Sequence, residues 1–291
     1  MRRLLLLATL LSTILLLGCT GDSETASVEG EADTREGASP SEDIHPHFAL
    51  TPEEFSRLLT DLPSKDVEDI LADPEGFLDL AAELLRGPTE LLLLVDKEHP
   101  LPAEYAPEDL VDLETLAARL TLTQEGLALR ELVMEDLFAM VEQARAEGIE
   151  LPITSTYRSY QYQAWLFDYW VEELGLEEAE RSSARPGTSQ HQLGTTIDFG
   201  SVTDAFAESK AGKWLAQNAR TFGFSLSYPE GYEELTGYKY ESWHFRYIGR
   251  PATRMQWRFF GGIQQRMLQF WNDNSKTLRD AYTGDPDRKA E

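Results

Sequence analysis

The pattern of hydrophobic and polar positions predicts helices at both ends of the folded part of the chain. Residues 51–54, Thr-Pro-Glu-Glu, have the capping hydroxyl, the early proline and the first-turn acids of a helix start. A second helix is predicted over 73–85, before Gly-Pro, and an amphipathic helix over 254–271. We therefore expect an N-terminal helical cap over residues 45–88 and a C-terminal helix with a polar tail over 253–291.

The middle of the chain alternates between strand and helix signals. Short apolar runs between turn residues predict strands, and apolar residues three and four positions apart predict helices. The predicted strands are 91–95, 149–156, 224–228 and 244–248, the predicted helices are 123–148, 160–174 and 209–221, and 177–186 is a predicted polar loop. This order predicts an α+β fold in which helices pack against a small, mostly antiparallel sheet. The central domain is expected over 89–252, with the extra helices at both ends.

The first 44 residues have the sequence pattern of a targeting segment and a tether rather than of a folded core. Residues 1–18 have a basic start and an apolar run that is short for a membrane span, as in a signal peptide. Leu16-Leu17-Gly18-Cys19 resembles the bacterial lipoprotein box, which implies cleavage before Cys19 and lipidation of that residue. An ordinary signal peptide that happens to end near a cysteine is the alternative. The remainder of 19–44 is acidic and small, which predicts a disordered tether. We expect a protein of the cell envelope, anchored on the outer side of the cytoplasmic membrane or facing the periplasm.

Composition excludes several classes of protein. The chain has 291 residues, 42% of them hydrophobic, and a formal net charge of −25. Such a charge excludes a general electrostatic footprint on nucleic acid, so no nucleic-acid partner is expected. The single cysteine excludes an intramolecular disulfide. We expect a monomer in which any cationic pocket is local.

Two short segments contain the residue types of a metal site. His191 and Asp198 are seven residues apart, and Glu241 precedes His244 by three residues. Two imidazoles and one carboxylate are a common ligand set for catalytic zinc, with water in the fourth position. The remaining carboxylate is the group that a metal-bound water needs as its base. Each residue also has a structural alternative: a core histidine, a turn-capping aspartate or a solvated glutamate.

The spacing of these residues restricts where they can lie. Residues an odd number of positions apart on one strand point to opposite faces. His191 and Asp198 can converge only if the chain bends between them, and Gly194 permits such a bend. We therefore expect His191 on a loop and Asp198 on a strand over 196–199. By the same argument, Glu241 lies in a turn before a strand that starts at His244.

Arg158 is the candidate cation for substrate. It follows a predicted strand and precedes an aromatic helix. A fixed guanidinium in such a place can bind a substrate carboxylate or stabilise a developing oxyanion. A structural ion pair is the alternative, because the chain is rich in carboxylates.

These segments belong to a wider set of motifs. The blocks 155–163, 186–198, 218–228 and 236–249 occur in the order found in the VanY-type D-alanyl-D-alanine carboxypeptidases, and 91–113 is similar to the lead-in of that family. The resemblance covers roughly residues 90–250 and leaves out both helical ends. The sequence departs from the family pattern at Ser242, where Pro is usual, and at Thr196, where Ala is common.

The resemblance implies a zinc peptidase domain over 89–252 that acts on bacterial cell-wall peptides. It implies that His191, Asp198 and His244 bind zinc and that Glu241 is the general base. It also implies that Arg158 contacts the carbonyl or oxyanion of the substrate. Further substrate contacts are implied for Ser189, Tyr157 and Gln163. None of the family's metal ligands is affected by the two departures.

We predict a membrane-tethered zinc D,D-carboxypeptidase that removes the terminal D-Ala from peptidoglycan stem peptides. An L,D-carboxypeptidase or a wall endopeptidase would use the same chemistry, and pocket shape decides among them. A non-catalytic wall-binding lipoprotein would be expected to have lost a ligand or the base, and all four positions are intact. A metal-uptake lipoprotein fits the lipid anchor but not a fourth group placed as a base.

Overall fold

The computed structural model describes residues 43–284. The predicted signal peptide, Cys19, nearly all of the predicted tether and the end of the predicted polar tail lie outside these residues. Within 43–284, no helix combines the length and the apolar character that a membrane crossing requires.

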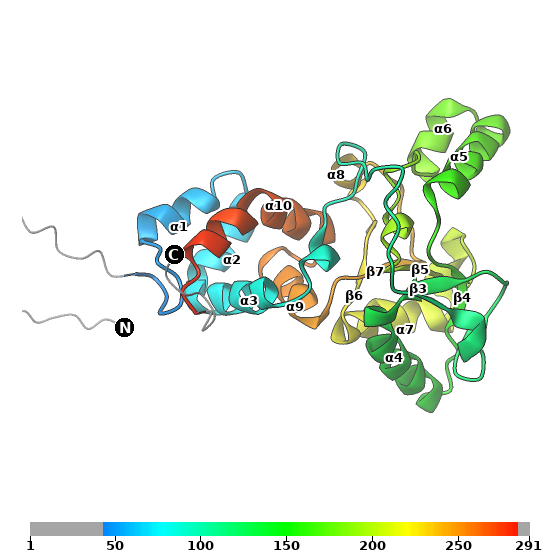
Figure 1. Cartoon of the computed structure of the whole chain (residues 1–291), viewed down its shortest axis with the longest axis horizontal. Helices are drawn as coiled ribbons and strands as arrows, with labels where there is room; N and C mark the ends of the chain where they lie inside the picture. Colours follow the sequence, from blue (N-terminus) through cyan, green and yellow to red (C-terminus); the bar gives the residue numbers. More distant parts are fainter. Residues whose placement is uncertain (1–42, 285–291) are drawn as a thin grey trace, which may run out of the picture. The chain divides into compact units, whose positions relative to one another are not determined.

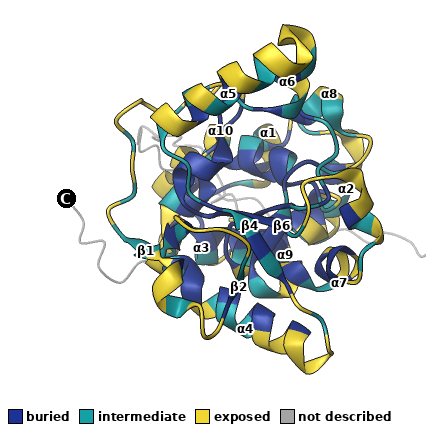
Figure 2. Ribbon diagram, turned by 90° about the vertical axis from the view of Figure 1, so that its right-hand side faces the viewer, coloured by how far each residue is buried: buried dark blue, intermediate teal, exposed yellow. Residues whose placement is uncertain are grey.

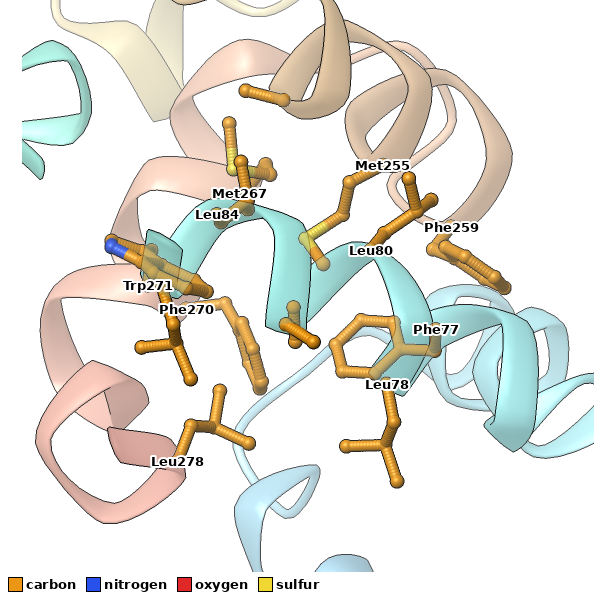
Figure 3. Close-up of a cluster of buried hydrophobic side chains, with 14 of the residues drawn as sticks. Phe77, Leu78, Leu80, Leu84, Met255, Phe259, Met267, Phe270, Trp271 and Leu278 are labelled. Carbon is orange, nitrogen blue, oxygen red and sulfur yellow. The ribbon is translucent and has the colours of Figure 1, made fainter. Parts of the chain in front are cut away.

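Helices from the two ends of the chain pack into one bundle (Figure 1). Its members are α1 (Pro52–Leu58), α2 (Ser64–Ala72), α3 (Pro74–Arg86), α9 (Arg250–Phe259) and α10 (Gln264–Ala281). Phe77 lies at the centre, with its ring 5.2 Å from that of Phe259 and 5.4 Å from that of Phe270 (Figure 3). Each such buried side chain contributes about 1.5–3 kcal/mol of transfer free energy. A shared core therefore joins the N-terminal and C-terminal helices.

The helices predicted near the N-terminus of the described chain start close to the predicted residues, whereas the helix predicted near the C-terminus does not have the predicted bounds. Thr51 caps α1 in a capping box, and α3 starts one residue after the predicted position. The single helix predicted over 254–271 is wrong, because α9 and α10 are separate helices. Gly261 and Gly262 lie between them with φ angles of 58° and 77°. Glycine adopts this left-handed backbone without the steric cost of a side chain.

The central sheet has five short strands in the order β2-β4-β5-β7-β6. They are β2 (Thr121–Leu122), β4 (Pro152–Ser155), β5 (Thr196–Phe199), β7 (His244–Tyr247) and β6 (Phe224–Leu226). Only β2 and β4 pair in parallel, so the sheet is mostly antiparallel. A second sheet pairs β1 (Leu110–Asp112) with β3 (Ala128–Arg130). The predicted α+β class is confirmed.

The two faces of the central sheet differ in chemistry. One face packs its apolar side chains, including Ile197, Phe199 and Phe245, against α4 (Met134–Ala146) and α7 (Lys210–Asn218). Because side chains alternate along a strand, Asp198 and His244 belong to the opposite face. Helices α5 (Tyr160–Leu174), α6 (Leu176–Ser182) and α8 (Glu233–Thr236) lie at the other end of the sheet from α4 and α7 in Figure 1.

The strand predicted over 91–95 is wrong. Thr89–Leu92 form a short 3-10 helix, and the chain continues without pairing to a strand. The fully buried Arg246 of β7 donates from Nη2 to the backbone oxygens of Leu91 and Leu93, at 2.9 and 2.8 Å. A distant guanidinium thus takes the carbonyl groups that a neighbouring strand would have used.

Two further boundaries are corrected by the structure. The helix predicted over 123–148 begins only at Met134, because 128–130 pair with β1 as strand β3. The loop predicted over 177–186 contains α6, which carries Glu177 and Glu178 in its first turn. Acidic residues at that position interact favourably with the helix dipole. Helix α5, by contrast, has the predicted bounds and is capped by Ser159.

Candidate metal centre and active site

Three candidate metal ligands converge on the polar face of the central sheet. Asp198 of β5 and His244 of β7 are directly opposite each other in the antiparallel register. His191 lies in the short 3-10 helix Gln190–Leu193, which ends at Gly194 with a φ of 70°. The bend at Gly194 is as predicted, and the predicted loop before β5 contains this short 3-10 helix, which carries His191. The turn before β7 also places Glu241 as predicted, with its backbone N–H donating to the oxygen of Tyr228 at 3.1 Å.

The ligand atoms of His191, Asp198 and His244 all lie within 4.8 Å of one another. His191 Nε2 and His244 Nδ1 are each 3.2 Å from a carboxylate oxygen of Asp198. All three residues are buried, and His191 Nε2 makes no hydrogen bond of good geometry with the described residues. Burying such an atom without a partner costs about 1–3 kcal/mol. Two imidazole nitrogens and one carboxylate fit zinc, which would satisfy this atom.

The hydrogen bonding of His191 orients its ring for this role. Its Nδ1 lies 2.6 Å from the backbone oxygen of Thr156, so Nδ1–H donates to that oxygen and leaves Nε2 with a lone pair toward Asp198. Burial and the nearby Arg158 guanidinium lower the pKa of His191 to about 4. The imidazole is therefore neutral at neutral pH, which is the form that binds a metal.

Neighbouring charged groups determine the direction of the pKa shifts of Asp198 and His244. Burial would raise the pKa of Asp198, but His191 and His244 hold it well below its usual range. Burial would lower the pKa of His244, but Asp198 and Glu241 raise it to about 9. A metal ion that binds His244 Nδ1 replaces that proton.

Glu241 and Arg158 complete the arrangement around the cluster. Glu241 Oε2 lies 3.2 Å from His244 Nδ1, and the Glu241 side chain is 14% exposed. Burial raises the pKa of Glu241. Arg158 Nη2 is 3.8 Å from Asp198 Oδ2, and Arg158 Nε is buried without a hydrogen-bond partner among the described residues. A carboxylate and a guanidinium therefore flank the three ligands.

A cavity of about 580 Å³ opens onto this cluster. Its lining includes the five residues named above and Ser189, together with Tyr228, Tyr238, Lys239 and the α5 residues Tyr162, Leu166, Trp170 and Leu174. Tyr157 and Gln163 are not among the lining residues. Gln163 is buried and donates to the backbone oxygen of Ala184 at 2.7 Å, which fixes the loop after α6. The predicted substrate contacts of these two residues stay predictions.

The sequence pattern does not identify a glutamine network behind His244. Gln190 Oε1 lies 3.3 Å from His244 Nε2 and also accepts from the hydroxyl of Ser227 at 2.7 Å. Gln190 Nε2 donates to Gln264 Oε1 at 3.3 Å, and Gln264 is the first residue of α10. The first residue of α10 therefore contacts the side chain that lies against the far nitrogen of a candidate metal ligand. No spacing rule could connect residues 190 and 264, because only the folded chain brings them together.

Comparisons with known proteins agree with this geometry. Residues 126–250 match the family described as VanY: D-alanyl-D-alanine carboxypeptidase. The bifunctional D-Ala-D-Ala dipeptidase and D-Ala-D-Ala carboxypeptidase VanXYC of Enterococcus gallinarum is 33% identical over 174 residues, which cover 56% of this chain and 86% of that protein. Two other curated relatives are matched over 65% and 52% of their own length, so the chain spans about half to two thirds of them.

Solved structures show the same similarity. The LdcB LD-carboxypeptidase superposes with a TM-score of 0.56 at 32% identity, covering 62% of this chain and 86% of that one. A vancomycin resistance D,D-pentapeptidase, VanY, solved in complex with Zn(II), superposes with a TM-score of 0.52 at 29% identity, covering 62% of this chain and 99% of that one.

Proposed function

Because the chain belongs to the VanY-type D-alanyl-D-alanine carboxypeptidase family of zinc peptidases, we propose that it is a D,D-carboxypeptidase that removes the terminal D-Ala from peptidoglycan stem peptides. The observation that carries the proposal is the buried set of His191, Asp198 and His244, with Glu241 and Arg158 beside it in one cavity. A zinc-binding fold without catalytic activity would not require a general base and a cation beside the three metal ligands.

We assign the zinc to His191, Asp198 and His244. Zinc bound there supplies a Lewis acid that lowers the pKa of water to about 7 and polarises a carbonyl group. Glu241 accepts the proton of the attacking water as the new C–O bond forms at the scissile carbonyl. Its buried position, which raises its pKa, makes it a stronger base than an exposed carboxylate. Glu241 then delivers the proton to the leaving nitrogen as the C–N bond breaks.

We propose that Arg158 binds a negatively charged group of the substrate. Its Nε is buried without a partner among the described residues, so the guanidinium keeps donor capacity toward the cavity. A guanidinium can stabilise the oxyanion that develops on the carbonyl oxygen, or bind the free carboxylate of a peptide. Such a local cation is required because the chain as a whole is strongly anionic.

Mass spectrometry of wall peptides tests this function. The zinc-loaded protein is incubated with a pentapeptide that ends in D-Ala-D-Ala and with a tetrapeptide that ends in one D-Ala, with and without a chelator. We expect loss of one alanine from the pentapeptide alone, abolished by the chelator. Loss from the tetrapeptide would assign the protein to the L,D class, which the similarity to LdcB supports as the second candidate. Cleavage within a cross-linked peptide would indicate an endopeptidase instead.

We further propose that a lipid on Cys19 anchors the protein to the outer side of the cytoplasmic membrane or at the periplasmic face of another membrane. The support is the order of basic residues, apolar run and Leu-Leu-Gly-Cys in the sequence. Cells fed a clickable fatty acid should label the wild-type protein and leave the Cys19→Ser variant unlabelled. Equal labelling of both proteins would rule out Cys19 as the anchor.

A further inference from the structure

Helix α5 carries a row of aromatic side chains on its exposed surface. Tyr162, Trp165 and Tyr169 are 49%, 59% and 43% exposed. They are three and four positions apart, so they lie on one side of the helix. The rings of Trp165 and Tyr169 stack at 6.1 Å with 24° between their planes, and Tyr162 is 5.5 Å from Trp165. Figure 2 shows α5 and α6 as the largely exposed elements at one edge of the molecule. Clustered exposed aromatic rings of this kind mark a binding surface.

This aromatic row, Tyr162, Trp165 and Tyr169, continues directly from the candidate catalytic cavity. Tyr162 belongs to both, because it lines the cavity together with Leu166 and Trp170 of the same helix. Arg158 lies just before α5 and also lines the cavity. A ligand that enters the active site along α5 therefore passes the aromatic row on its way.

The spacing of the aromatic row can be compared with the reach of an extended wall peptide. A helix rises about 1.5 Å per residue, so Tyr162 and Tyr169 are about 10 Å apart along the axis. An extended peptide spans about 3.3–3.6 Å per residue, so three residues also cover about 10 Å. The glycan of peptidoglycan is attached to the end of the stem peptide that is remote from the terminal D-Ala. A stem of five residues spans about 17 Å when extended, so with its terminal residue at Arg158 and Glu241 its sugar-linked end reaches the aromatic row.

The charge around the row favours sugar over a lipid surface. The exposed residues Asp168, Glu172 and Glu173 lie on α5 itself, and the exposed Glu177 follows on α6. These carboxylates would repel an anionic bilayer. A pyranose ring carries no such charge, and one of its faces consists of C–H groups that can pack flat on an aromatic ring.

We propose that Tyr162, Trp165 and Tyr169 bind the glycan of peptidoglycan, next to the cavity that takes the stem peptide. This inference rests on the proposed function, because it assigns the sugar-linked form of the same substrate. The row then selects stem peptides that are still attached to wall glycan over free peptides. It also gives the protein a binding site for wall glycan from which peptides have been removed.

The test compares Trp165→Ala with Trp257→Ala, a matched control on α9 whose side chain is 58% exposed. The zinc-loaded proteins are assayed on a free pentapeptide and on the same pentapeptide linked to its disaccharide. We expect Trp165→Ala to raise KM for the disaccharide-linked substrate about 2- to 10-fold more than for the free peptide, the effect of one aromatic contact. Trp257→Ala should change the two values of KM in equal measure. Equal effects of Trp165→Ala on both substrates would overturn the proposal.

A binding experiment separates this inference from the proposed function. Glycan strands from which all stem peptides have been removed should retain the wild-type protein and the Trp257→Ala variant, and retain Trp165→Ala less. This result needs no hydrolysis, so it would stand even if the protein cleaved neither peptide. Failure of the wild-type protein to bind stripped glycan would overturn the inference while leaving the peptide assay untouched. If Trp165→Ala lost binding to phosphatidylglycerol vesicles that the wild-type protein binds, and kept its binding to glycan, the row would be assigned to a lipid surface. That result would also overturn the inference.

Discussion

Replacing Glu241 with glutamine should lower kcat roughly 10²- to 10⁴-fold, the range typical of a general acid–base residue. The amide keeps the size of the side chain but cannot accept the proton of the attacking water. Zinc content should stay at one ion per chain, because Glu241 is not among the three proposed ligands. The measurement is pentapeptide turnover together with metal analysis of the same preparation.

The matched control for this prediction is Glu234→Gln. Glu234 is an exposed residue seven positions upstream, on α8, and its variant should turn over peptide like the wild type. Near-normal turnover by metal-replete Glu241→Gln would exclude Glu241 as the base. Loss of zinc from that variant would instead make Glu241 a ligand.

The second large effect is expected at Gln190. Its side-chain oxygen lies 3.3 Å from His244 Nε2, the ring nitrogen that faces away from Asp198. Partners of this kind orient a metal-binding imidazole, and their removal typically weakens metal binding about 10- to 100-fold. We therefore expect Gln190→Ala to weaken zinc binding by that factor, measured by competition with a chromophoric chelator. Zinc added in excess should restore much of the turnover.

Gln192 provides the matched control for Gln190. It is buried in the same short helix, but its side chain donates to the backbone oxygens of Pro102 and Tyr105, both at 3.0 Å, and touches no candidate ligand. Gln192→Ala should therefore change stability more than zinc affinity. If the two variants bound zinc equally well, the glutamine network would have a purely structural role.

The parts of the site that follow from local chemistry could be predicted from the sequence. The odd spacing of His191 and Asp198 requires a bend, and only Gly194 between them can adopt a positive φ at low cost. The same parity argument places Glu241 in a turn before β7. These predictions succeed because both residues of each pair lie within a few positions of the feature that positions them.

The parts that failed depend on residues far apart in the chain. The apolar run at 91–95 has the composition of a strand, but Arg246 takes its carbonyl oxygens. Gln264 touches Gln190 only because the first residue of α10 lies beside β6, where its amide donates to the backbone oxygen of Ser225, while α10 itself belongs to a bundle built by both ends of the chain. The break at Gly261-Gly262, by contrast, has a local signal, since two adjacent glycines interrupt the predicted helix.

A zinc titration of the metal-free protein tests the central claim most directly. Zinc is added in steps to chelator-treated protein, and release of D-Ala from the pentapeptide is measured at each step. We predict no release before zinc, then a linear rise that stops at one zinc per chain, where His191, Asp198 and His244 are filled. Full release by the metal-free protein, or none after one equivalent of bound zinc, would contradict the account.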